Sequence, residues 1–149
     1  MPNTIIPIAS DHRGFALKAS LVAWLTTHGF APKDLGAHSA ERCDALDFAT
    51  TMAGEINANA GQIGVLICGT GQAMAMTANR YRTLRAALCT SADMARLARE
   101  HNDANVLVLG ADITPPDAAL RILEAFLETQ FLGGRYAERR DRLTALDGL

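Results

Sequence analysis

A thiol and a glycine-rich turn stand side by side within residues 64–80. The short apolar run Val65–Ile67 predicts a buried strand that delivers Cys68 directly into a Gly-Thr-Gly turn at 69–71. The next residues, 73–79, predict a helix. Unpaired N–H groups at the start of a helix favour a thiolate and bind an oxyanion. The segment therefore predicts a base and a charge-stabilising pocket close to each other.

Acidic and imidazole side chains accompany other predicted strands. The apolar run 5–9 is followed by Ser10, Asp11 and His12, and His101 lies at the end of the helical segment that precedes the run 105–110. In an open parallel sheet, ligands bind outside the carboxyl ends of the strands. We therefore expect acid, imidazole and thiol to converge on one rim of the sheet.

Each candidate also has a purely structural interpretation. Cysteines are often inert packing, but the glycines after Cys68 leave room for backbone to approach a ligand. Cys89 ends a predicted strand without such a turn, so we interpret it as core, and Cys43 as a loop residue. His101 alone is equally well explained as a residue that caps a helix C-terminus, and Asp11 as an N-cap.

The last predicted helix, 135–146, carries the most basic segment of the chain. Arg135 and Arg139 are four residues apart and share one face of that helix. Arg140 and Arg142 are interpreted as a solvated face. Since the helix follows a Gly-Gly hinge, it is a candidate for packing against a partner subunit, where Arg135 and Arg139 would bind an anion.

The composition excludes several classes of protein. Apolar residues make up 49% and charged residues 20% of the 149, and the net charge of −2 argues against a nucleic-acid partner. No apolar run reaches transmembrane length, and the amino terminus lacks the features of a signal peptide. Three cysteines without a Cys-x-x-Cys pair favour a reducing cytoplasm. No metal site is expected, because Asp11, His12, His101 and Asp103 include no pair at i, i+4 spacing.

Short β-branched runs alternate with longer amphipathic segments along the chain. The predicted strands are 5–9, 31–35, 63–67, 85–89 and 105–110. The predicted helices are 14–28, 45–59, 73–79, 91–102, 114–131 and 135–146. This alternation predicts a single α/β domain over 1–149, with a five-stranded parallel sheet and helices on both faces. Pro7 cannot donate to a strand ladder, so a bulge or an unpaired position is expected there.

Taken together, the motifs resemble the type B ribose-5-phosphate isomerases, a family that includes the galactose-6-phosphate isomerase subunits. The motifs that carry the resemblance are Asp11-His12-x-Gly14, Ile67-Cys68-Gly69-Thr70-Gly71, Ala78-Asn79-Arg80, His101-Asn102-Asp103-x-Asn105-Val106-Leu107 and Gly133-Gly134-Arg135-x-x-x-Arg139. They span nearly the full chain in order. The resemblance implies a Rossmann-like fold and a homodimer, with tetramers as a further option. It also implies a C-terminal helix that reaches the partner, active sites shared between subunits, and no cofactor or metal.

The implied reaction is aldose–ketose interconversion of a sugar phosphate through a cis-enediolate. Cys68 corresponds to the base that moves a proton between C1 and C2, and Asp11 to the group that moves one between O1 and O2. His101 corresponds to the group that opens the furanose ring, helped by Thr70. Removing a proton beside a carbonyl places negative charge on oxygen, so aimed N–H donors are the main requirement.

The resemblance also implies the residues that bind the substrate. The implied oxyanion pocket consists of the backbone N–H groups of residues 69–73, that is Gly69, Thr70, Gly71, Gln72 and Ala73. The implied phosphate ligands are His12, Arg135 and Arg139, and the implied ligand of a sugar hydroxyl is Asn102.

The chain departs from the family pattern at three places. Ala45-Leu46 replaces a Tyr-Pro pair whose tyrosine lines the sugar site, and Ala73 replaces a glycine of the loop. Asp112 replaces an arginine that helps to grip the phosphate. The implied catalytic residues are thus intact, whereas residues that position the substrate are altered.

Isomerisation of ribose 5-phosphate to ribulose 5-phosphate is the first functional prediction. A phosphorylated tetrose or hexose is an alternative substrate, and a non-catalytic sugar-phosphate-binding paralogue is an alternative function. A flavin or nucleotide binder is a third interpretation based on fold analogy alone. Against it, the first predicted strand is not followed by Gly-x-Gly-x-x-Gly.

Overall fold

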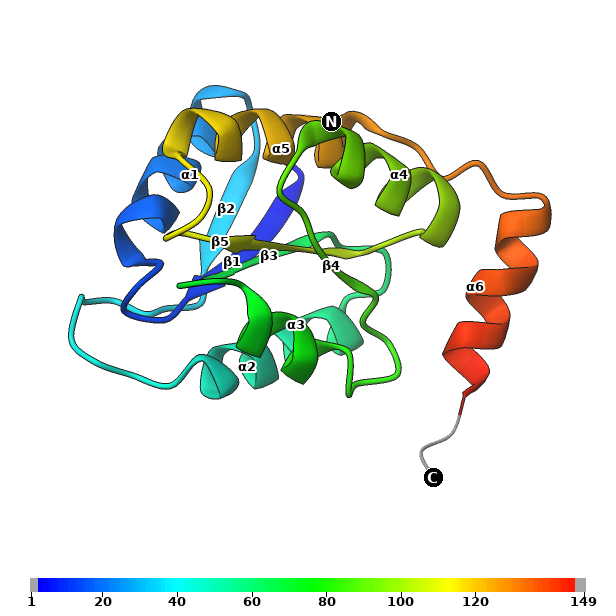
Figure 1. The fold of residues 1–149 in the computed structure, drawn as a ribbon, viewed down its shortest axis with the longest axis horizontal. Coiled ribbons are helices and arrows are strands. Elements are labelled where there is room, and N and C mark those ends of the chain that lie inside the picture. Colours follow the sequence, from blue (N-terminus) through cyan, green and yellow to red (C-terminus); the bar gives the residue numbers. More distant parts are fainter. Residues whose placement is uncertain (1–2, 147–149) are drawn as a thin grey trace.

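A parallel sheet of five strands organises the chain (Figure 1). The computed structural model describes residues 3–146, so the ends of the predicted domain 1–149 lie outside the described residues. The strands are β1 (Ile5–Ser10), β2 (Ala31–Asp34), β3 (Gly64–Cys68), β4 (Ala86–Leu88) and β5 (Val106–Gly110). The helices are α1 (Phe15–Thr27), α2 (Ala45–Ala58), α3 (Gln72–Ala78), α4 (Ala92–Asn102), α5 (Pro116–Glu128) and α6 (Arg135–Ala145).

Helices cover both faces of the sheet, as predicted. The strand order is β2-β1-β3-β5-β4, with β3 at the centre and every neighbouring pair parallel. Helices α1, α4 and α5 pack on one face and α2 and α3 on the other (Figure 1). This confirms the α/β Rossmann-like arrangement, and the predicted elements all occur.

The largest shift from a predicted boundary is at the end of α5. The prediction extends this helix to residue 131, but it ends at Glu128 because Thr129 is already extended, with φ −87° and ψ 130°. The following segment leaves the helix axis and runs past α4, where the Leu132 N–H donates to the Glu100 carbonyl at 3.1 Å. Contacts with a neighbouring helix thus override the local helical pattern.

Pro7 lies within β1 without distorting it. The register with β2 runs continuously from Ile5 to Ile8, and Pro7 stands opposite Lys33, so the expected bulge is absent. Pairing with β3 begins only at Ile8. The missing N–H therefore falls outside the ladder with β3, which fits the expectation of an unpaired position.

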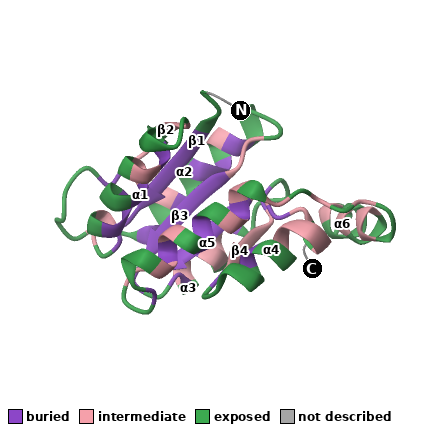
Figure 2. Ribbon diagram, turned by 90° about the horizontal axis from the view of Figure 1, so that it is seen from above, coloured by how far each residue is buried: buried purple, intermediate pink, exposed green. Residues whose placement is uncertain are grey.

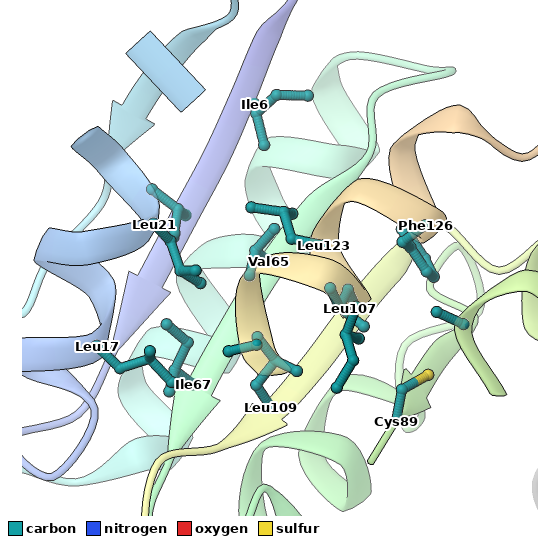
Figure 3. Packing of buried hydrophobic residues seen from close by; sticks show 14 of the residues in the cluster. Ile6, Leu17, Leu21, Val65, Ile67, Cys89, Leu107, Leu109, Leu123 and Phe126 are labelled. Atoms are coloured by element: carbon teal, nitrogen blue, oxygen red, sulfur yellow. The ribbon is translucent and has the colours of Figure 1, made fainter. Parts of the chain in front are cut away.

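Two apolar clusters hold the helices to the sheet. The larger one joins Ile6, Val65 and Leu107 of the strands to Leu21 of α1 and Phe126 of α5 (Figure 3). The second cluster joins α2 and α3 to the opposite face. Because residues of β3 and β5 are fully buried between these layers, the ends of the central strands are rigidly placed.

Helix α6 differs from the rest of the fold. It stands apart at one side of the sheet and none of its described residues is buried (Figures 1 and 2). Its contacts within the chain are mainly with α4. Among the described residues, no helix combines the length and the apolar character needed to cross a bilayer.

Candidate active site

Cys68 is the last residue of β3 and lies at the carboxyl edge of the sheet. It stands opposite Gly110, the last residue of β5. Its side chain belongs to the cluster on the α2–α3 face, and the residue is 4% exposed. A small molecule would therefore reach the thiol from the rim of the sheet, where Gly69 and exposed Thr70 follow it.

The backbone after Cys68 is held from one side. The carbonyls of Cys68 and Gly69 accept hydrogen bonds from the N–H groups of Ala111 and Asp112, each at 2.8 Å. In a trans peptide the C=O and N–H point in opposite directions. The N–H groups of Gly69 and Thr70 therefore point away from the β5–α5 loop. Within residues 3–146 neither of them donates a hydrogen bond.

Gly71 starts α3 in a conformation that favours glycine. Its φ is +81°, and a Cβ built on it would lie 2.5 Å from Leu88 Cδ1. The Gln72 N–H makes a long contact of 3.4 Å with Thr70 Oγ1. The Ala73 N–H, like those of Gly69 and Thr70, has no acceptor among the described residues. The turn thus presents several free donors beside the thiol, and these can bind a small anion.

Asp11 and His12 lie at the same edge, after β1. Asp11 is 6% exposed, and its Oδ1 accepts the N–H groups of Arg13 at 2.9 Å and Gly14 at 3.1 Å. The carboxylate therefore does cap the turn into α1, and Oδ2 is the oxygen left for other chemistry. His12 Nδ1 lies 3.2 Å from the Cys43 carbonyl and 3.3 Å from the Cys43 N–H. Either tautomer finds a partner there, so the ring is held with Nε2 directed elsewhere.

Asp112 does not stand as an isolated negative charge. Its carboxylate is paired with the guanidinium of Arg13, and the two side chains are 42% and 59% exposed. Arg13 was not among the predicted site residues, although it stands between His12 and Gly14 in the first motif. Sequence position alone does not show that its side chain reaches across to the β5–α5 loop.

His101 and Asn102 lie at the opposite edge of the sheet. They end α4, which leads into Val106, and Val106 stands opposite Gly64 at the start of β3. The expectation of one shared rim is therefore wrong for His101 within a single chain, whereas Asp11 and His12 do lie at the rim that carries Cys68. The physical reason is that a helix joining parallel strands runs antiparallel to them, so its last residues lie at the amino edge.

The predicted phosphate ligands of α6 are also at this far edge. Arg139 donates to the His101 carbonyl at 3.0 Å, and Arg135 donates to the Tyr136 hydroxyl at 3.1 Å. The His101 ring stacks on Tyr136, with centroids 4.4 Å apart. Both guanidinium groups lie over the Tyr136 ring as well. Tyr136 is a residue of this group that the sequence analysis missed, although it stands beside Arg135 and one turn from Arg139.

At the end of α4, Asp103 forms ion pairs with three arginines. Its carboxylate pairs with Arg140 at 2.8 Å, Arg99 at 3.3 Å and Arg85 at 3.6 Å. Burial lowers the pKa of the Arg85 and Arg99 guanidinium groups, and the Asp103 charge opposes that shift. Arg140 pairs with Asp141 at 3.1 Å, as expected for a solvated face, but its bond to Asp103 also joins α6 to the body of the protein.

The other cysteines fit their structural interpretations. Cys89 belongs to the same apolar cluster as Leu107 and Phe126 (Figure 3), and burial raises the pKa of its thiol to about 11. Cys43 is half-buried in the loop that precedes α2. In the part of the chain that the structure describes, no cluster of His, Cys, Asp and Glu is arranged to hold a metal ion.

Known proteins share both the sequence pattern and the fold. The pattern of the ribose/galactose isomerase family matches residues 6–143. Ribose-5-phosphate isomerase B of Escherichia coli is 37% identical, over 95% of each chain. A putative sugar phosphate isomerase of Rickettsia bellii is 40% identical over 90% of this chain and 93% of the relative.

Solved structures of ribose 5-phosphate isomerases have the same fold as this chain. A ribose 5-phosphate isomerase of Thermotoga maritima has a TM-score of 0.93 and 43% identity, covering 96% of this chain and 99% of the other. Ribose-5-phosphate isomerase B of Mycoplasma genitalium, solved with bound ribulose 5-phosphate, has a TM-score of 0.92 and 37% identity, covering 97% and 96%. From its sequence pattern, its relatives and its fold, the chain belongs to the ribose/galactose isomerase family of sugar-phosphate isomerases.

Proposed function

We propose that the protein interconverts ribose 5-phosphate and ribulose 5-phosphate. The observation that carries this proposal is the buried Cys68 thiol beside free N–H groups on the same turn. Relatives named ribose-5-phosphate isomerase B support the choice of substrate, as does the bound ribulose 5-phosphate in the M. genitalium structure. The three described cysteines are free, which supports a reducing cytoplasm as the compartment.

The proposed chemistry is a proton transfer between neighbouring carbons. Cys68, as thiolate, takes the proton from C2 of the open-chain aldose, and the electron pair moves onto the carbonyl oxygen to give a cis-enediolate. The N–H groups of Gly69 and Thr70 stabilise that oxygen. Asp11 Oδ2 carries a proton between O1 and O2, and the thiol returns its proton to C1 to give the ketose.

Groups from a second copy complete the proposed site. Cys68 and His101 are separated by the length of β5, five residues at about 3.3 Å each. One pentose phosphate cannot contact both within a single chain. A two-fold dimer in which α6 reaches the partner would bring His101, Arg135 and Arg139 of one copy to Cys68 of the other. His101 would then open the sugar ring, and the arginines and His12 would bind the phosphate.

Two of the departures bear on the choice of sugar. The pairing of Arg13 with Asp112 offsets the negative charge that replaces the family arginine. At the start of α2, Ala45 is buried and Leu46 is 49% exposed, where the family has a tyrosine that lines the sugar site. The smaller side chain leaves room for a different sugar, which keeps tetrose and hexose phosphates as alternative substrates.

A turnover assay across aldose phosphates of four, five and six carbons tests the proposal. We expect the highest kcat/KM with ribose 5-phosphate. A preference for a tetrose or hexose phosphate would correct the substrate and keep the reaction. Calorimetric binding without turnover of any of these sugars would contradict the enzyme and indicate a binding protein.

A further inference from the structure

An ion pair joins two strand ends across a third. Arg13, just after β1, pairs with Asp112, just after β5. Gly69, just after β3, lies between them. A Cβ built on Gly69 would be 2.8 Å from Asp112 Oδ2 and 2.9 Å from Arg13 Nε. The two side chains therefore lie directly against the turn that follows Cys68.

Backbone hydrogen bonds connect the same pair to the proposed catalytic groups. The Arg13 N–H donates to Asp11 Oδ1 at 2.9 Å, and the Asp112 N–H donates to the Gly69 carbonyl at 2.8 Å. Because the Gly69–Thr70 peptide is planar, the bond to the Gly69 carbonyl sets the direction of the Thr70 N–H. The position of Asp112 thus decides where that donor points.

We propose that Arg13 and Asp112 form a positioning clamp for the oxyanion pocket. The ion pair fixes Asp112 across the turn, and Asp112 keeps the Thr70 N–H directed at the substrate oxygen that becomes negative. Donors that are aimed in advance need no reorganisation during the reaction. The clamp rests on the proposed isomerase activity and adds two residues to it, neither of which touches the reacting atoms.

A role in global stability does not account for the pair. The side chains are 59% and 42% exposed, and ion pairs this exposed contribute little to folding. Substitutions at Arg13 and Asp112 are therefore expected to leave the protein folded, so that their effect on rate can be measured.

The clamp is tested by steady-state kinetics with ribose 5-phosphate as substrate. The variants are Arg13→Ala, Asp112→Ala and the double variant. Each single variant is expected to lower kcat about tenfold, less than the 10²–10³-fold loss of a whole oxyanion donor, with KM near the wild-type value. The double variant should be no worse than either single variant, because both remove the same contact. Lys33→Ala removes the ion pair between Lys33 of the edge strand β2, which is 51% exposed, and Glu55 of α2, which is 12% exposed. It serves as the control with wild-type kinetics.

The kinetics also distinguish a clamp from direct phosphate binding by Arg13. If Arg13 bound the phosphate, Arg13→Ala would raise KM, whereas Asp112→Ala would free the cation and lower KM. Opposite effects on KM, losses that add in the double variant, or an unchanged kcat would each overturn the clamp.

Amide hydrogen exchange gives a readout that needs no turnover. In Arg13→Ala the Asp112 N–H should exchange at least about tenfold faster than in the wild type or Lys33→Ala, because its contact with the Gly69 carbonyl opens locally. Unchanged exchange would overturn the clamp even in an active enzyme. Absence of turnover by the wild type would instead contradict the proposed function, and the exchange experiment would still decide the clamp.

Discussion

The two edges of the sheet present chemical groups in different ways. At the carboxyl edge, Cys68 and Asp11 are 4% and 6% exposed, and the turn between β3 and α3 is fixed by backbone bonds to the β5–α5 loop. At the amino edge, His101 is half-buried, and Arg135 and Arg139 are exposed on α6. One edge holds buried groups beside a turn that the chain itself fixes, whereas the other displays side chains on and beside a helix that stands apart.

This difference shows which part of a site a single chain can build. The thiol turn needs only the sheet, because buried strands and their loops define its geometry. The ring of His101, at the end of α4, stacks on Tyr136 of α6, a helix that stands apart from the body (Figure 1). The rigid half at the carboxyl edge and the displayed half at the amino edge fit the proposed site shared between two copies.

Removal of the thiol is the strongest test of the rigid half. Cys68→Ala should lower kcat by about 10²–10⁴-fold, the usual contribution of a general base. Calorimetric affinity for the sugar phosphate should stay near that of the wild type, because the N–H donors and phosphate ligands remain. Cys89→Ala is the control, since its thiol is buried in the core. Near-normal turnover by Cys68→Ala would assign the base to another residue.

Truncation of an arginine on α6 tests the displayed half. Arg139→Ala should raise KM about 10- to 100-fold, as expected for loss of a hydrogen bond to a charged group, with a smaller change in kcat. Arg142→Ala, an exposed arginine on the same helix, should leave KM unchanged. Equal effects of the two substitutions would mean that only the overall charge of α6 matters.

Two glycine substitutions compare the effect of backbone strain alone with the effect of a steric clash at the start of α3. Gly71→Ala places a Cβ against Leu88 at a φ of +81° and should cost about 1–3 kcal/mol in the free energy of unfolding, together with a loss of kcat. Gly61→Ala has a similar φ of +90° with open space around it, so it should lose less stability and retain kcat. Urea denaturation and steady-state kinetics measure both. An unchanged kcat in Gly71→Ala would show that the start of α3 does not shape the pocket.

Acid should slightly lower the free energy of unfolding, because it protonates Asp34 and weakens its ion pair with Lys18 at the carboxyl edge. Burial alone would raise the pKa of Asp34, but hydrogen bonds from Lys18 and the Gly36 N–H lower it below 3.8. A lowered pKa stabilises the folded state above pH 3.8, and this stabilisation is lost as pH falls through the lowered value. Unfolding free energies of the wild type should therefore fall more steeply in this acid range than those of Asp34→Asn. Parallel pH profiles would contradict this contribution.

Much of this architecture could be predicted from the sequence. Strands rich in valine, leucine and isoleucine between amphipathic segments gave the layers, and the Gly-Thr-Gly turn marked the edge beside Cys68. The partnership of Arg13 with Asp112 could not be predicted, because it joins residues distant in the chain across a third strand end. The placement of His101 was misjudged because its helix runs against the strands, which follows from topology rather than from local pattern.

Complementation between two inactive variants tests the shared site most directly. Cys68→Ala and His101→Ala, carried by separately tagged chains, are co-expressed and purified as the mixed dimer and as the statistical mixture. In a mixed dimer with shared sites, one site receives both defects and the other is intact, so the mixture should recover about a quarter of wild-type kcat. Activity no higher than that of the two parent variants would contradict a site built from two copies.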